Sequence, residues 1–122
     1  MHGIVIPKHR SASVNETVIR ASAGASEHML IARVTNVNNA IEELKENGVW
    51  IYAADMDGDD IYKTDLKGKI GLVIGGEGSG VKKLTKQLCD KVVALPIRGQ
   101  VNSLNASVAC GIVVYEALRQ RI

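Results

Sequence analysis

Residues 95–107 read Leu-Pro-Ile-Arg-Gly-Gln-Val-Asn-Ser-Leu-Asn-Ala-Ser, and this stretch decides how the second half of the chain is interpreted. An apolar strand expected over residues 92–95 runs into Pro96 and then into a polar turn. Ser103 is placed to cap a long apolar helix that we expect to end near Arg119. Core packing does not require the polar cluster of this turn, so we interpret it as part of a binding site: Asn102, Ser103, Asn105 and Ser107.

A second turn of this kind lies earlier in the chain. Residues 75–80 read Gly-Gly-Glu-Gly-Ser-Gly, between a strand expected at 70–74 and a helix expected at 81–88. The carboxyl ends of parallel strands meet at one edge of a sheet, where ligands bind in open α/β folds. The two turns therefore predict a pocket at that edge.

The rest of the chain repeats the alternation of strand and helix. We expect strands at 3–6, 29–34 and 49–53, with helices at 14–21 and from residue 37. Thr35 or Asn36 is placed to cap the second helix and Gly48 to end it. Residues 55–68 are polar, with a short edge strand expected around 61–62. This order predicts an α/β fold, a mainly parallel sheet flanked by helices.

Composition limits the classes of function. The chain has 122 residues, of which 46% are hydrophobic and 23% charged, as in an ordinary globular domain. One Trp, three Tyr and no Phe argue against a nucleic-acid module that stacks bases on exposed rings. The net charge of +2 permits contact with a phosphate backbone without requiring it.

The cysteines and the apolar segments indicate the cellular location of the protein. Cys89 and Cys110 stand alone, so we expect reduced, buried cysteines in a cytoplasmic protein without a metal site. No signal-peptide pattern opens the chain, and no uncharged stretch reaches about 18 residues, so we expect no membrane span.

The glycine turn also has to be compared with phosphate-binding loops. The dinucleotide fingerprint started at Gly76 reaches Gly78 and then fails at Val81. A P-loop started at Gly75 places Val81 where a lysine is needed. A carboxylate at Glu77 repels phosphate and suits a cationic or hydroxyl-bearing ligand, although it could simply favour the positive end of the next helix.

The two turns resemble motifs two and three of the SpoU family, which are S-adenosylmethionine-dependent RNA ribose 2′-O-methyltransferases of the SPOUT, or knotted, class. Residues 7–12 and 22–25 also resemble the bacterial subgroup that methylates a guanosine ribose in large-subunit ribosomal RNA. The resemblance covers nearly the whole chain. It implies a carboxyl-terminal trefoil knot and a homodimer, for which the apolar last helix is suited by Val108, Ile112, Val113, Tyr115 and Leu118.

The resemblance also implies roles for individual residues. Cofactor contacts are expected at Gly75, Gly76, Leu95, Ile97, Ser103, Leu104 and Asn105, with Thr35 and Asn36 lining the same pocket from another strand end. Glu77 and Asn105 are expected to position either the ribose or the family's catalytic arginine in the reaction, while Ser103 and Ser107 order the turn. Contacts with RNA phosphate are expected at Lys8, His9, Arg10, Lys82, Lys83, Lys86 and Arg98.

One part of the family pattern is missing. The first motif, whose arginine is thought to activate the ribose hydroxyl, lies upstream of the stretch matched by residues 3–7. We therefore expect a single SPOUT domain over residues 1–122, shortened at its amino terminus and lacking the family's first strand-helix segment. Arg10 or Arg98 would have to replace that arginine. Two alternatives stay open: a non-catalytic dimeric remnant that binds cofactor or RNA, and a phosphate-binding nucleotide protein.

Overall fold

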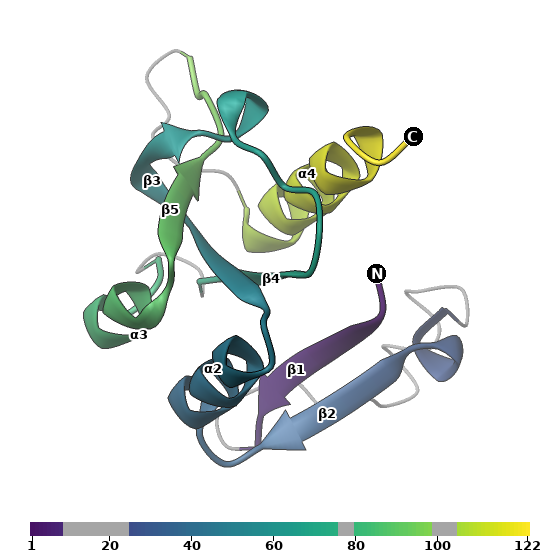
Figure 1. The fold of residues 1–122 in the computed structure, drawn as a ribbon. Coiled ribbons are helices and arrows are strands. Elements are labelled where there is room, and N and C mark those ends of the chain that lie inside the picture. Colours follow the sequence, from purple (N-terminus) through teal and green to yellow (C-terminus); the bar gives the residue numbers. More distant parts are fainter. Residues whose placement is uncertain (9–24, 76–79, 99–104) are drawn as a thin grey trace. The chain divides into compact units, whose positions relative to one another are not determined.

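The computed structural model describes residues 1–8, 25–75, 80–98 and 105–122 (Figure 1). They form two compact units, residues 1–40 and 41–122, and each is described by itself. The expectation of one domain over the whole chain stays a prediction. In chain order the elements are β1 (Gly3–Pro7), η1 (Ala25–His28), β2 (Leu30–Val34), α2 (Val37–Glu46), β3 (Trp50–Asp60), η2 (Ile61–Lys63), β4 (Ile70–Ile74), α3 (Lys83–Leu88), β5 (Lys91–Ala94) and α4 (Ala106–Arg119).

In the first unit, β1 and β2 run parallel and in register from Gly3 opposite Leu30 to Pro7 opposite Val34. The backbone N–H of Lys8 extends the pairing by donating to the carbonyl of Val34 at 2.7 Å. Both strands therefore end at the same edge. The helix expected at 14–21 lies outside the described residues.

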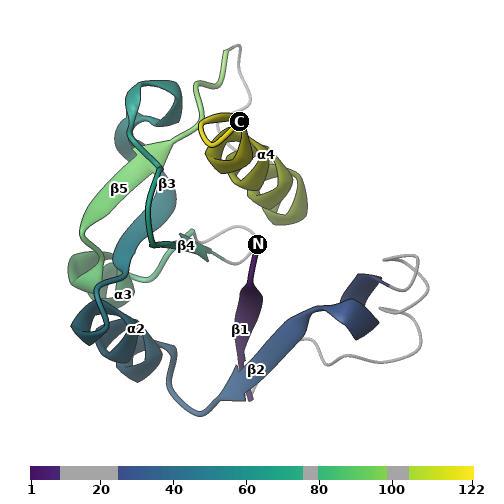
Figure 2. The ribbon, with the colours of Figure 1, turned by 45° about the vertical axis from the view of Figure 1, so that its right-hand side comes forward.

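The second unit contains a three-stranded parallel sheet in the order β4-β3-β5. Ala54 in the central strand pairs with Ile74 of β4 on one side and with Val93 of β5 on the other. Figures 1 and 2 show β3 between these two partners. All strand pairs among the described residues are parallel, which confirms that part of the prediction; they divide into this sheet and the β1-β2 pair.

The central strand is longer than expected. It was expected to end at residue 53, but after an irregularity between Ala54 and Asp59 it pairs again with β5, up to Asp60 opposite Ala94. The edge strand expected around 61–62 is wrong, because these residues form the short 3₁₀ helix η2. The carboxylate of Asp60 caps it by accepting from the N–H of Tyr62 at 2.9 Å, and Ile61 is fully buried. Capping and burial of one apolar side chain favour a helical turn over a flat edge strand.

The core of the second unit lies between the sheet and α4. Its buried members are Ile61, Leu66 and Val93, with Val113 and Ala117 contributed by the helix. Tyr52, Ala54, Ile70, Leu72 and Leu95 pack around it. The apolar pattern of the last helix therefore buries one side of α4 within its own unit and leaves Val108, Tyr115 and Leu118 exposed.

Two helix starts differ from the prediction. The helix α4 begins at Ala106 and its N-cap is Asn105, not Ser103, because the side chain of Asn105 accepts from the N–H groups of Ser107 and Val108. The helix α3 begins at Lys83 rather than at 81, because Lys82 has an extended backbone conformation, and the N–H of Val81 donates to the carboxylate of Asp55. The helix α2 is capped by Asn36, as predicted, with the N–H of Asn39 donating to its side chain at 3.2 Å.

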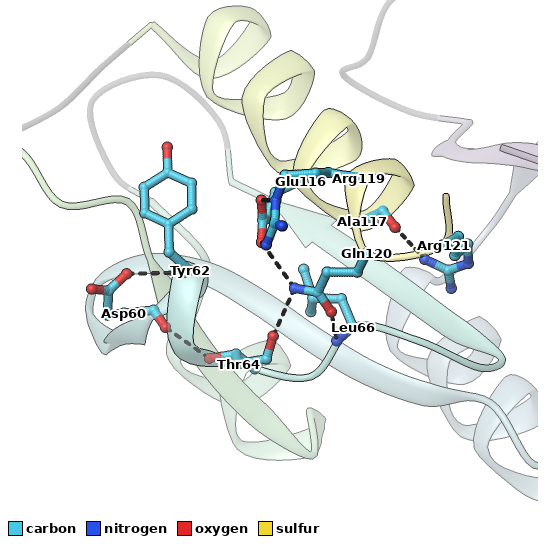
Figure 3. Close-up of polar contacts among 9 residues, drawn as sticks. All are labelled: Asp60, Tyr62, Thr64, Leu66, Glu116, Ala117, Arg119, Gln120 and Arg121. Carbon is cyan, nitrogen blue, oxygen red and sulfur yellow. Dashed lines mark hydrogen bonds and ion pairs between the residues drawn. The ribbon is translucent and has the colours of Figure 1, made fainter.

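The end of α4 is attached to the segment between β3 and β4 (Figure 3). The side-chain oxygen of Gln120 accepts from the N–H of Leu66 at 2.7 Å, and its nitrogen donates to the carbonyl of Thr64 at 2.9 Å. The guanidinium of Arg121 donates to the carbonyl of Gly68 at 2.7 Å. These polar contacts add to the apolar packing of Val113 and Ala117 in holding the last helix in place. Within the described ranges, no helix combines the length and apolar character needed to cross a membrane.

Candidate functional site

The sheet brings the two predicted turns to one edge. Because β4 and β5 both run parallel to β3, Gly75 after β4 and Leu95 after β5 leave the sheet at the same end, on either side of Ala54. Leu95 is half-buried, and Ile97 and Arg98 are exposed. The shared edge expected from the sequence is therefore confirmed for Gly75 and Leu95.

The two ends of the glycine turn are in backbone contact. A Cβ atom at Gly75 would overlap the carbonyl group of Gly80 and the nitrogen of Val81, so only glycine allows this approach. Gly80 itself has a φ of +67°, in the left-handed region that favours glycine. These two glycines are needed to close the turn, whatever ligand it binds.

A residue that the sequence analysis did not single out stabilises this closure. Asp55 follows Ala54 in the central strand, and its carboxylate lies 2.8 Å from the ammonium of Lys86. The same carboxylate accepts from the N–H of Met56 at 2.7 Å and from the N–H of Val81 at 3.4 Å. A Cβ at Gly80 would lie 3.1 Å from it. Asp55 therefore links β3, α3 and the end of the glycine turn.

The charges of this cluster are mutually stabilised. Partial burial raises the pKa of Asp55, but the hydrogen bonds from Lys86, Met56 and Val81 outweigh it and hold that pKa below its ordinary value. The hydrogen bond with Asp55, aided by Asp57, raises the pKa of Lys86. Both groups are ionised at neutral pH. Lys86 is thus paired with two carboxylates, and its expected role as a phosphate contact stays a prediction.

Asn105 occupies a fixed position at the start of α4. Its side-chain oxygen accepts from the N–H of Ser107 at 2.9 Å, from the N–H of Val108 at 3.4 Å and from the hydroxyl of Ser107. The two residues therefore form one small network at the amino end of the helix, where unpaired N–H groups need acceptors.

Comparison with known proteins identifies the family. The sequence profile of the SpoU rRNA Methylase family matches residues 1–115. The chain belongs to this family. It is 44% identical to the 23S rRNA (guanosine-2′-O-)-methyltransferase RlmB of Xanthomonas campestris pv. campestris over 98% of the chain and 48% of that protein. It is 47% identical to the putative TrmH family tRNA/rRNA methyltransferase YacO of Bacillus subtilis, over 98% of the chain and 49% of that protein.

Solved structures agree with this assignment. The SpoU methyltransferase AviRb from Streptomyces viridochromogenes, crystallised in complex with the cofactor AdoMet, superposes with a TM-score of 0.89 at 28% identity. The match covers 98% of this chain and 50% of AviRb. The chain thus has the α/β fold of SpoU methyltransferases and spans about half the length of the curated relatives that it matches.

The other predicted site residues of this SpoU chain fall into two groups. Lys82, Lys83 and Arg98 are exposed in the second unit, beside the ends of the two turns. Lys8, Thr35 and Asn36 are exposed in the first unit, where β1 and β2 end. There the guanidinium of Arg33 donates to the carbonyl of Lys8 at 3.1 Å.

Seven further predicted residues fall outside the described residues and stay predictions: His9, Arg10, Gly76, Glu77, Asn102, Ser103 and Leu104. Open hollows of the second unit lie by η2 and α4. Cys89 and Cys110 are free and half-buried, not fully buried as expected. No group of three metal-binding side chains occurs in the part of the chain that the structure describes.

Asp55 is the main residue that the sequence reasoning missed. A signal for it was present, because Asp55 and Asp57 directly follow the apolar run of the central strand. The criterion that selected the other two turns, polar residues at a strand end, applies equally to this third strand.

Proposed function

We propose that this chain is the cofactor-binding part of an enzyme that transfers a methyl group from S-adenosylmethionine to a ribose 2′-hydroxyl of RNA, in ribosomal RNA. Family membership and the relatives named above support the reaction class. The structural observation that carries the proposal is the position of Gly75 and Leu95 at one sheet edge, on either side of Ala54.

Described residues at this edge support binding of the adenosine part of such a cofactor. Gly75 has no Cβ atom, so its backbone is accessible to close approach. The backbone of Leu95 and Ile97 follows Ala94, the last residue of β5 that pairs with β3. These segments provide N–H and C=O groups at one edge of the sheet. Backbone groups of this kind bind the edges of a purine without needing charged side chains. Thr35 and Asn36 remain proposed contacts.

The bound cofactor would supply an electrophilic methyl group on its sulfonium. The protein then has to orient the ribose hydroxyl and exclude water. Correct orientation alone can lower the activation free energy by several kcal/mol. We assign ribose positioning to Asn105, whose side chain is fixed by the N–H groups of Ser107 and Val108. Glu77 and Ser103 are proposed to assist it.

The RNA would bind through exposed cations. Lys82 and Lys83 stand at the beginning of α3, and Arg98 follows β5, so three positive side chains accompany the two turns. Their charge attracts phosphate in a salt-dependent way. Lys8, His9 and Arg10 are proposed as further contacts.

Free thiols at Cys89 and Cys110 and an RNA substrate support a cytoplasmic location.

The assembly that we propose is a homodimer in which each chain forms the trefoil knot of the SPOUT class. The exposed side chains of Val108, Tyr115 and Leu118 on α4 support pairing with a second copy. The knot is proposed from family membership. The hydrogen bonds of Gln120 with Leu66 and Thr64 hold the end of the last helix against the segment between β3 and β4.

Two measurements test this function. Calorimetry with S-adenosylhomocysteine should give saturable binding, while ATP and GTP should not bind. Transfer of tritium from labelled S-adenosylmethionine to ribosomal RNA, followed by digestion to nucleosides, should give a 2′-O-methylnucleoside, and DNA of the same sequence, which lacks the hydroxyl, should remain unlabelled. Binding without transfer would instead favour the non-catalytic remnant, and binding of ATP or GTP alone the nucleotide protein.

A further inference from the structure

We propose that Asp55 is a positioning residue for the cofactor: together with Lys86 it fixes Gly80 and Val81 against Gly75, so that the Gly75 backbone is presented to the adenosine. This inference rests on the proposed function and adds a residue to its site. It concerns described residues of the second unit only.

The geometry makes Asp55 the shared partner of three elements. Its carboxylate accepts from Lys86 of α3 at 2.8 Å and from the N–H of Val81 at 3.4 Å, while its own backbone belongs to the central strand. The Gly75 backbone in turn contacts Gly80 and Val81 directly. A displacement of Val81 would therefore move the surface against which Gly75 is held.

The two carboxylates that bind Lys86 differ in a way that separates their roles. The side chain of Asp55 is 16% exposed, whereas that of Asp57 is 68% exposed and lies farther from the ammonium, at 3.2 Å. Exposed ion pairs contribute little because water and salt screen them, while partly buried ones with several hydrogen bonds hold a fixed geometry. Asp57 is therefore a matched control for Asp55, since among the described residues its carboxylate binds Lys86 while the N–H of Val81 donates to Asp55.

The experiment compares S-adenosylhomocysteine binding by the full chain and four variants. Asp55→Asn and Lys86→Met should raise the Kd about tenfold, the loss expected for one charge-assisted hydrogen bond. Lys86→Arg, which keeps the ion pair, and Asp57→Asn should stay within about twofold of the unchanged chain. Urea denaturation of each variant gives its stability, so that a loss of fold is recognised separately.

A spectroscopic readout distinguishes positioning from a general structural role. Hydrogen exchange at the Val81 amide, followed by NMR without ligand, should accelerate in Asp55→Asn and not in Asp57→Asn, while exchange in the core of α4 stays unchanged. If Asp55→Asn does not fold, Lys86→Met decides alone, because it replaces a partly exposed side chain of α3.

The outcomes are separable. Equal Kd values for the unchanged chain, Asp55→Asn and Lys86→Met would overturn this inference and leave the proposed function intact. Equal weakening by Asp57→Asn and Asp55→Asn would also overturn it, because general charge would then explain the effect. Failure of the unchanged chain to bind S-adenosylhomocysteine would overturn the proposed function, and the inference with it.

Discussion

The side-chain oxygen of Gln120 accepts a hydrogen bond from the backbone N–H of Leu66 at 2.7 Å, across 54 residues of sequence. The same amide donates to the carbonyl of Thr64 at 2.9 Å and to the carboxylate of Glu116 at 2.9 Å (Figure 3). The side chain of Gln120 thus provides hydrogen-bond partners for two backbone groups of a loop that belongs to no β-strand. Partly buried backbone groups need such partners.

Replacing Gln120 should therefore weaken the fold. Gln120→Ala leaves the Leu66 N–H and the Thr64 carbonyl without this partner, and we expect the free energy of unfolding to fall by about 1–3 kcal/mol. Urea denaturation measures it. Gln87→Ala, an exposed glutamine on α3, is the matched control and should change stability by less than about 0.5 kcal/mol. Equal losses in both variants would contradict the role given to Gln120.

Glu116 should make the fold sensitive to acid. Hydrogen bonds from Arg119 and Gln120 lower the pKa of this buried carboxyl from 4.5 to about 2. A lowered pKa in the folded state means that its stabilisation is present above pH 4.5 and is lost as the pH falls toward 2. Denaturation curves over that range should show stability falling less steeply in Glu116→Gln than in the unchanged chain. Glu42→Gln, on an exposed position of α2, controls for the loss of one charge.

Asn105 has a structural role that can be separated from its proposed catalytic one. Asn105→Ala removes the N-cap of α4 and should lower stability by about 1 kcal/mol. Asn105→Asp keeps an acceptor for the N–H groups of Ser107 and Val108 but loses the amide donor. We expect near-normal stability and reduced methyl transfer in Asn105→Asp, measured by denaturation and tritium incorporation. Full activity in Asn105→Asp would remove the amide from the mechanism.

The exposed side of α4 gives a prediction about assembly. Tyr115 is 72% exposed, and placing a charge there by Tyr115→Glu should raise the dissociation constant of the proposed dimer by about tenfold or more, because a buried charge opposes association. Sedimentation velocity measures this. Leu84→Glu adds the same charge at a residue of α3 that is 61% exposed and should leave the dimer unchanged. A monomeric unchanged chain would contradict the proposed dimer.

The position of the candidate site could be predicted from local sequence. Apolar runs before Gly75 and before Pro96 indicated two strands, and the alternation with helices indicated that these strands are parallel. Parallel strands have their carboxyl ends together, so the shared edge followed without knowledge of the packing. Local pattern was insufficient at residues 61–62, where the cap formed by Asp60 favours a 3₁₀ helix over a strand.

The sequence by itself determined the family, through the motifs at 75–80 and 95–107, and the sheet edge at which Gly75 and Leu95 lie. It also gave most of the alternation of strands and helices among the described residues, because periodicity and turn composition are properties of neighbouring residues. Only the tertiary structure decided that Asp55 meets Val81, 26 residues later, and that Gln120 meets Leu66. Such pairs depend on strand register, on the irregularity in the central strand after Ala54 and on how α4 packs on the sheet. These are long-range features, and no local spacing of residues encodes them.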